Sequence, residues 1–348
     1  MLNSIVEISE IKNINQYNFM KIVSLNIILA SAYLVFGSLS FAASVEYGNV
    51  TSVLFAPEGI ALAFFILFGP RVAFGVILGQ MILSYYSGPS ILGGLGIGIF
   101  NALEGILGGY LFHRLKLSKS FDRPKDVIVF ISIVFFILQP ISATFGVLIL
   151  FAVSSIPAET FGWFGQFWLE HGIQKPLASL DLVANAWISW WIGNSLGQLI
   201  FAPLVLAWVC TQKRFTKPSL FDLAIFIASI IFFYYIFQLD LEKGSILILV
   251  FSYPLVLWIG RLGIKSITTM NLLISLVIVY IASTGYAFME NLSASDRVFY
   301  ASLAISSLSL SSLFIYSLLS ERNIFINQLQ ELANKDPLTQ ADNRRYFM

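Results

Sequence analysis

Two glutamates interrupt long apolar stretches of this 348-residue sequence, and they are its strongest candidates for chemistry. Glu58 stands between Pro57 and Gly59, so the helix around it is expected to be broken and to leave backbone groups that need partners. Glu104 follows Asn101 by three residues, which places both on one helix face. Ionisable groups at membrane depth are expensive and mark functional sites. The two carboxyl groups could bind a small ligand or act as a proton-sensitive pair.

Asn194 and Arg71 complete the candidate sensing residues. Asn194 lies in a later apolar stretch, and Arg71 lies in the short segment Gly69-Pro70-Arg71 between two apolar runs. The other polar residues at plausible membrane depth are Gln80, Gln139, Asn185 and Gln198. An alternative explanation is that these side chains form interhelical hydrogen bonds that only hold the bundle together.

Other kinds of chemistry are excluded by the composition and the spacing of residues. Cys210 is the only cysteine, which rules out an internal disulfide and a thiolate metal cluster. No metal-ligand spacing, nucleophile motif or phosphate-binding glycine loop occurs in the sequence. The net charge of +1 does not favour a nucleic-acid partner.

The elements that must hold these residues are transmembrane helices. The chain is 57% hydrophobic and 11% charged, with a mean hydropathy of +0.82, whereas about a quarter of the residues of a soluble domain are charged. A span needs about 20 apolar residues, and membrane lipid is therefore the first expected partner. The apolar runs predict helices at Ile22–Ala43, Val53–Phe68, Val72–Tyr86, Ile91–Phe112, Val127–Val153, Leu182–Cys210, Phe221–Gln238, Ser245–Gly260, Ile267–Ala287 and Val298–Leu319.

The basic residues predict an orientation. Of the 20 Lys and Arg residues, all but Lys175, Lys243 and Arg297 fall on one side if the N-terminus is cytoplasmic, as the positive-inside rule requires. Both termini are then cytoplasmic. The two short helices that meet at Gly69-Pro70 are either two spans or a re-entrant hairpin. Both termini are cytoplasmic in either case.

The sequence changes character after Leu319, where a polar segment begins. A heptad-like stripe continues the last span into this segment and consists of Ile315, Leu319, Arg322, Ile326, Leu329 and Ala333. It predicts a stalk at 315–333 through which two copies pair as a homodimer. The alternative is an amphipathic helix that packs on a neighbouring domain.

The last residues resemble the opening signature of GGDEF diguanylate cyclase domains, Asp-x-Leu-Thr-Gly-Leu/Ala-x-Asn-Arg-Arg-x-Phe. Gln340 replaces the usual glycine of that signature. The matching residues are Asp336, Leu338, Thr339, Ala341, Asn343, Arg344, Arg345 and Phe347. By this resemblance Asn343 contacts guanine.

The apolar part, over about residues 22 to 315, resembles the first type of membrane-associated sensor domain, the MASE family that precedes GGDEF domains and some histidine kinases. The family often has Trp where Phe55 stands, and usually Asp where Asn194 stands. The matching positions are Pro57, Gly59-Ile60-Ala61-Leu62-Ala63, Phe68-Gly69, Arg71, Gly75, Gly79, Asn101, Glu104, Asp126-Val127, Ser142-Ala143, Gly146, Trp190 to Asn194, Gly197, Leu199 and Pro203.

Together these resemblances imply an all-α, multi-pass protein of the bacterial inner membrane, with about eight to ten transmembrane helices and the first turn of an α/β GGDEF domain. The expected parts are a cytoplasmic segment at 1–21, a MASE-like sensor at 22–319, a signalling helix or short coiled coil at 320–335, and the beginning of a GGDEF domain at 336–348.

The sensor would respond to an unknown small-molecule or membrane-derived signal and control the conversion of two GTP to cyclic di-GMP. A complete GGDEF domain would use Mg²⁺. The Gly-Gly-Asp/Glu-Glu-Phe loop does not occur in the 348 residues, so we expect this chain to be inactive as a cyclase, as a fragment or an interrupted gene product. The alternatives are a multi-helix small-molecule transporter and the sensor part of a histidine kinase.

Overall fold

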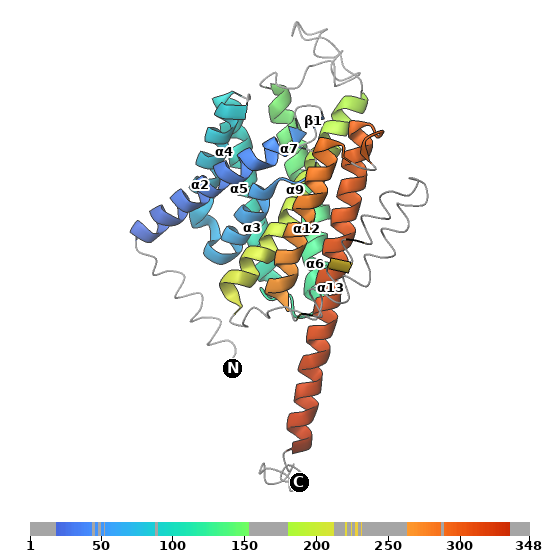
Figure 1. Ribbon diagram of the computed structural model, residues 1–348. Coiled ribbons are helices and arrows are strands. Elements are labelled where there is room, and N and C mark those ends of the chain that lie inside the picture. Colours follow the sequence, from blue (N-terminus) through green and yellow to red (C-terminus); the bar gives the residue numbers. More distant parts are fainter. Residues whose placement is uncertain are drawn as a thin grey trace, which may run out of the picture.

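The computed structural model describes a bundle of long helices and one short β-ribbon (Figure 1). It describes residues 19–43, 46–47, 50–51, 53–87, 90–152, 180–211, 263–286 and 289–334, with five single positions between 220 and 231. The helices are α2 (Phe19–Ala42), α3 (Ala56–Phe68), α4 (Ala73–Ser87), α5 (Ile91–Arg114), α6 (Pro124–Ile133), α7 (Gln139–Ala152), α9 (Leu180–Cys210), α12 (Ile264–Thr284) and α13 (Ala294–Asn334). The other elements are strands β1 (Glu46–Tyr47) and β2 (Val50–Thr51), a 3₁₀ turn at Gly69–Val72 and a π-helical turn at Val134–Leu138.

Seven helical stretches in the described part are long and apolar enough to cross a membrane. The all-α membrane fold is therefore confirmed there, apart from the antiparallel β1–β2 ribbon. Each apolar run expected in this part overlaps one of these stretches, with ends that differ by a few residues, and the runs on either side of Gly69 share the stretch Ala56–Ser87. Apart from four single positions in Phe221–Gln238, the expected spans Phe221–Gln238 and Ser245–Gly260 lie outside the described residues, so the total of eight to ten stays a prediction.

The stretch Ala56–Ser87 is two helices rather than one straight span, and the chain bends sharply at Gly69. Gly69 has a φ of 69°, a conformation that glycine adopts without strain. Beyond it, α4 runs antiparallel to α5, because the backbone of Gly94 lies against Ser84 and that of Gly98 lies against Ile77.

Helix α3 runs antiparallel to α4 and in the same direction as α5. The carbonyl oxygen of Ile66 lies 2.8 Å from Nε2 of His113 where both helices end, and Glu58 and Glu104 interact electrostatically nearer to their beginnings. With 13 and 15 residues, α3 and α4 are each shorter than the roughly 20 residues of a span. A re-entrant hairpin and two spans both fit these directions, so the choice between them stays a prediction.

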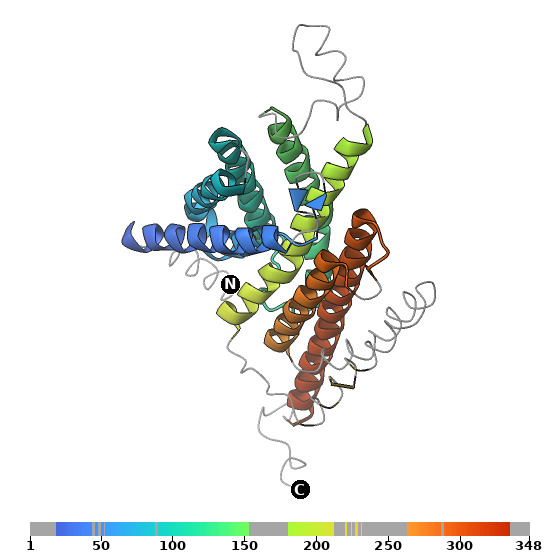
Figure 2. The ribbon, with the colours of Figure 1, turned by 45° about the horizontal axis from the view of Figure 1, so that its top comes forward.

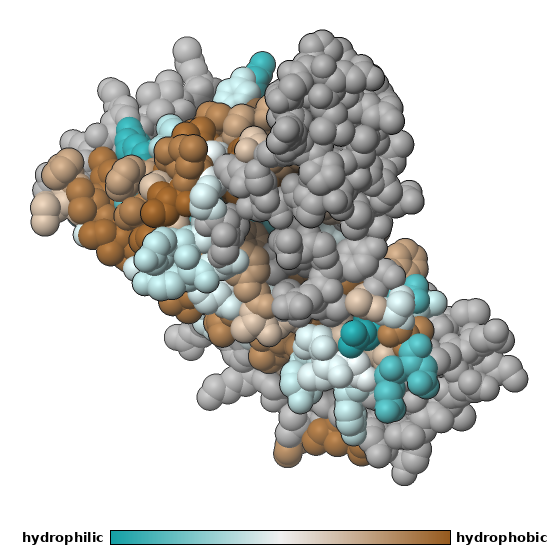
Figure 3. Space-filling model, turned by 90° about the horizontal axis from the view of Figure 1, so that it is seen from above, coloured by the Kyte–Doolittle hydropathy of each residue, from teal (hydrophilic) through white to brown (hydrophobic). Residues whose placement is uncertain are grey.

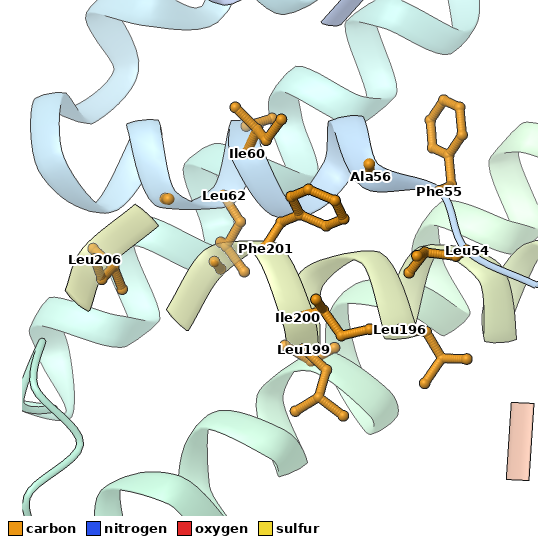
Figure 4. Packing of buried hydrophobic residues seen from close by; sticks show 14 of the residues in the cluster. Leu54, Phe55, Ala56, Ile60, Leu62, Leu196, Leu199, Ile200, Phe201 and Leu206 are labelled. Carbon is orange, nitrogen blue, oxygen red and sulfur yellow. The ribbon is translucent and has the colours of Figure 1, made fainter. Parts of the chain in front are cut away.

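The tightest contact in the core joins α3 to α9. The N–H of Phe55 donates to the carbonyl oxygen of Gly193 over 3.0 Å, and the two helices approach so closely that a Cβ at Gly59 would collide with the carbonyl oxygen of Gly197. In Figure 4, Phe201 of α9 lies directly beside α3, next to Ile60. Small residues allow this close backbone approach in membrane proteins.

Helices α12 and α13 lie side by side, as Figure 2 shows. The Nδ2 of Asn271 in α12 donates to Oγ of Ser312 in α13 over 2.7 Å. Helix α13 is continuous over 41 residues, so the last apolar span and the polar segment after Leu319 form one helix. Its end extends well beyond the other helices in Figure 1.

Apolar side chains are exposed on the helices that would face lipid. Seen from above, they gather on the side of the bundle where α2 lies (Figure 3). On α2 they include Ile27, Ile28, Val35 and Leu39, each more than half exposed. Large exposed apolar areas mark membrane or protein contacts, as expected for a membrane bundle.

Candidate functional site

Glu58 is fully enclosed at the beginning of α3. Pro57 occupies the first turn of the helix, where a missing N–H does no harm, and the Glu58 side chain points into the bundle with 1% of its surface exposed. The hydroxyl of Tyr33, from α2, donates to Oε1 of Glu58 over 2.6 Å. Tyr33 is itself completely buried.

Tyr33 joins this carboxyl group to α5. The Nδ2 of Asn101 donates to the hydroxyl oxygen of Tyr33 over 2.8 Å, so a chain of hydrogen bonds runs from Asn101 through Tyr33 to Glu58. Three helices contribute one side chain each. A bridge in which a hydroxyl accepts one bond and donates the next fixes the orientation of both partners.

Glu104, one turn further along α5, is the second centre of the cluster. Its Oε1 accepts hydrogen bonds from Nε2 of Gln139 in α7 and from Nε2 of Gln198 in α9, both over 2.6 Å. Ser142 lies beside the same carboxyl group, and its oxygen accepts a bond from Nε1 of Trp190 over 3.3 Å. The central polar cluster, defined as Tyr33, Glu58, Asn101, Glu104, Gln139 and Gln198, thus draws on five helices.

A π-helical turn at Val134–Leu138 directly precedes Gln139. Such turns are rare and are frequent at functional sites. The carbonyl oxygen of Phe135, inside this turn, accepts a hydrogen bond from Nε1 of Trp191 in α9 over 2.8 Å. The turn is therefore fixed against α9, and Gln139, which is completely buried, follows it into the cluster.

The cluster contains two carboxyl groups and no basic partner within the described residues. The ion pair found in that part of the chain joins Arg123 to Asp126, away from both glutamates. Glu58 and Glu104 nevertheless interact electrostatically with each other. Because an unpaired charge in an apolar interior is very costly, the arrangement suits a site that accepts a proton or a cation.

The sequence-predicted residues fall into two groups. Glu58, Asn101 and Glu104 lie together in the cluster. Asn194 is buried on α9, one turn before Gln198, and its Nδ2 has no hydrogen-bond partner within the described residues. Arg71 lies beyond the other end of α3 from Glu58, where its backbone carbonyl oxygen accepts from Asn26, so the structure does not bring it to the glutamates.

Tyr33 and the roles of Gln139 and Gln198 were missed as site residues. Both glutamines are visible in the sequence as polar residues in apolar runs, but their pairing with Glu104 depends on helix packing. Tyr33 gives no such signal, because a tyrosine is ordinary in an apolar span.

A second polar cluster lies where α13 passes the loop between α5 and α6. The Oδ1 of Asp122 accepts hydrogen bonds from the hydroxyl of Tyr316 over 2.9 Å and from Oγ of Ser320 over 2.8 Å. Ser120 also bonds to Asp122. Phe121 is buried at a φ of 51°, a strained value for a bulky residue, and such strain is common at switch regions.

The tail signature lies outside the described residues, which end at Asn334. This concerns Asp336, Leu338, Thr339, Asn343, Arg344, Arg345 and Phe347. Their roles stay predictions.

Comparison with known proteins bears on the first half of the chain. No curated protein and no solved structure matches the chain significantly. Residues 23–170 match the MASE1 family, and this range contains Tyr33, Glu58, Asn101, Glu104 and Gln139, but not Gln198. The chain is thus a multi-pass membrane protein whose first half is similar to MASE1, a membrane sensory domain.

Proposed function

We propose that this protein is the membrane-embedded sensory input module of a cyclic di-GMP signalling protein in the bacterial inner membrane. A small-molecule or membrane-derived signal acts on the central polar cluster, and α13 carries the response to a GGDEF domain that begins at Asp336. Such a domain, when complete, joins two GTP into cyclic di-GMP and uses Mg²⁺. The proposal combines the MASE1 match with the resemblance of residues 336–347 to the opening signature of GGDEF domains.

The observation that carries this proposal is the contact of Asp122 with Tyr316 and Ser320. Asp122 belongs to the MASE1-like half, whereas Tyr316 and Ser320 belong to the helix that leaves the bundle. The loop that holds Asp122 directly follows α5, the helix of Asn101 and Glu104. A shift of α5 on signal binding therefore has a short hydrogen-bonded route to α13.

The end of α13 suits pairing with a second copy of the chain. Of the heptad positions beyond the bundle, Ile326 is 37% exposed and Leu329 is 65% exposed. Leu332, beside the stripe, is 75% exposed. Apolar side chains in this arrangement are typical of a helix that packs against another. A homodimer through 315–333 would bring two GGDEF domains together, as formation of cyclic di-GMP requires.

A chimera tests the proposal. Residues 1–335 are joined to a complete GGDEF domain, and cyclic di-GMP is measured in a bacterial strain without other cyclases. We expect cyclic di-GMP from the parent chimera and a change of about fivefold in Asp122→Ala, since allosteric coupling energies begin near 1 kcal/mol. Glu321→Ala is the matched control, because it removes an acidic side chain next to Ser320 and should leave the level unchanged.

Two outcomes would contradict the proposal. If a chimera that is inserted in the membrane produced no cyclic di-GMP, control of a GGDEF domain by this sensor would be excluded. Equal levels in the parent, Asp122→Ala and Ser320→Ala would exclude the Asp122 route. Ser320→Ala removes a single hydrogen bond. It replaces Asp122→Ala in the test if the Asp122→Ala chimera does not insert into the membrane.

A further inference from the structure

Three buried oxygen atoms around Glu104 lack a hydrogen-bond donor among the described residues. They are Oε2 of Glu104, Oε1 of Gln139 and Oε1 of Gln198. All three side chains are at most 2% exposed. Buried polar atoms are nearly always hydrogen-bonded, and an exception calls for an explanation such as a bound ion.

The three oxygens form one group. The amide nitrogens of Gln139 and Gln198 both donate to Oε1 of Glu104. Each unpaired oxygen is bonded to the same carbon as an atom of this hydrogen-bonded set, so each belongs to one of the three side-chain groups that α5, α7 and α9 bring together at Oε1 of Glu104.

Rearrangement of the described side chains does not supply a donor for each of the three oxygens. Reversal of either glutamine amide would place its oxygen against the carboxylate and remove a bond that exists. Asn194 has an unpaired Nδ2 one turn before Gln198 but donates to none of the three oxygens. A proton on Oε2 of Glu104 and the hydroxyl of Ser142 beside it supply two donors, which leaves one amide oxygen without a donor.

The charge of the cluster also favours a bound cation. Glu58 and Glu104 interact electrostatically, and neither forms an ion pair with a described basic side chain. Glu58 has the hydroxyl of Tyr33 as its partner. The partners of Glu104 are the neutral amides of Gln139 and Gln198 and the neutral hydroxyl of Ser142. The three unpaired oxygens therefore belong to one carboxyl group and two neutral amides, and a single positive charge balances that one carboxylate.

We propose that the oxygens of Glu104, Gln139 and Gln198 bind a compact monovalent cation, either a sodium ion or the ammonium group of a small amine. Carboxylate and amide oxygens are the ligands that hard metal cations prefer, and an ammonium group has three N–H donors to match three acceptors. Binding would tie α5, α7 and α9 together. The site itself does not depend on the output domain, and only its use as a signal rests on the proposed function.

Thermal unfolding of the purified full chain in detergent tests this site. The unfolding midpoint is followed by tryptophan fluorescence in sodium, methylammonium or N-methylglucamine chloride, at constant ionic strength and at two pH values. We expect the midpoint to rise and saturate with sodium or with methylammonium, and the comparison of these two distinguishes the metal from the amine. N-methylglucamine is much larger than either of these cations and should have no effect.

Variants assign the response to these residues. Glu104→Gln keeps the size of the side chain but removes the charge, so the cation response should be lost. Gln198→Leu should raise the half-saturating concentration about tenfold, which corresponds to one lost bond to a charged ligand. Gln80→Leu is the control, because Gln80 is another buried glutamine with an unpaired Oε1, and its Nε2 donates to Oγ of Ser84 rather than to Glu104.

Equal midpoints in all three chlorides would overturn the proposal, and so would an unchanged response in Glu104→Gln. A midpoint that follows pH alone would show that a proton occupies the site, which also overturns it. If Glu104→Gln does not fold, the cation site is tested by the cation series on the unmodified chain and by the response of Gln198→Leu. None of these results depends on cyclic di-GMP, so failure here is distinct from failure of the proposed function.

Discussion

Ser320 donates a hydrogen bond of 2.8 Å to Asp122, a residue 198 positions earlier in the chain. This bond joins the loop after α5 to α13 at the level where α13 leaves the bundle. Tyr316, one turn before Ser320, bonds to the same Oδ1 over 2.9 Å. Two bonds to one oxygen from successive turns fix both the height and the rotation of α13, so a rotation of the stalk must break at least one of them.

The rotation of the stalk can be tested by insertion of residues after Glu321. One inserted alanine rotates the helix beyond it by about 100°, whereas seven restore the original face to within about 20°. In the chimera we expect one alanine to change cyclic di-GMP strongly and seven to restore most of the parental level. Equal effects of the two insertions would show that stalk rotation does not carry the signal.

Pairing of the stalk predicts a periodic pattern of crosslinks. Single cysteines are introduced into a Cys210→Ser background, since Cys210 is the only native cysteine. Disulfide dimers should form readily at Ile326 and Leu329, which lie on the heptad stripe. Asn327, on the outer face, is the control and should crosslink poorly. Equal crosslinking at all three positions, measured on non-reducing gels of membranes, would argue against a parallel coiled coil.

The bridge through Tyr33 should be important for stability. Tyr33→Phe removes the hydroxyl that donates to Glu58 and accepts from Asn101, and leaves both partners without this bond inside the bundle. The expected loss is about 1–3 kcal/mol of unfolding free energy. Tyr110→Phe is the control, because Tyr110 is 60% exposed on α5. Similar unfolding midpoints for the two variants would show that the bridge adds little.

Part of this cluster could be predicted from the sequence. Carboxyl groups in apolar runs are rare enough for Glu58 and Glu104 to stand out, and the helical spacing of Asn101 and Glu104 places them on one face. Their common location in the structure follows from the crossing of α2, α3 and α5. Spacing within one helix does not determine which helices cross. Tyr33 was missed because a tyrosine does not stand out in an apolar run and its role depends on this crossing.

The Asp122 contact could not be predicted for a different reason. In a loop rich in Lys and Arg, an aspartate is expected to be solvated or paired with a neighbouring cation. Its bonds with Tyr316 and Ser320 depend on the docking of α13 beside α6, which composition does not encode. The continuation of the last span as one helix, in contrast, follows from local periodicity, and α13 has that form.

The α3–α9 contact predicts strong sensitivity to an added methyl group. In Gly59→Ala the new Cβ would collide with the backbone of α9 at Gly197, and backbone atoms cannot move aside as the end of a side chain can. Overpacking of this kind costs about 1–3 kcal/mol or more. We expect a lower unfolding midpoint and a reduced membrane yield.

Gly96→Ala is the matched control for this substitution. Its Cβ would lie 3.3 Å from the flexible end of Ile149, which can adjust, and a change from glycine to alanine within a helix is itself favourable. If Gly59→Ala is as stable as Gly96→Ala, the two helices are not in close contact in the membrane.

The orientation can be tested with reporter fusions at the two ends of α13. The basic residues predict that Asn334 is cytoplasmic and that the turn before Ala294 is periplasmic. Within the structure, His113 and Asp122 lie at the end of the bundle from which the stalk projects, together with the basic loop that contains Arg114 and Arg123. Alkaline phosphatase, which is active only in the periplasm, should therefore be active after Ser293 and inactive after Asn334. Green fluorescent protein should give the opposite pattern, and phosphatase activity after Asn334 would reverse the assigned orientation.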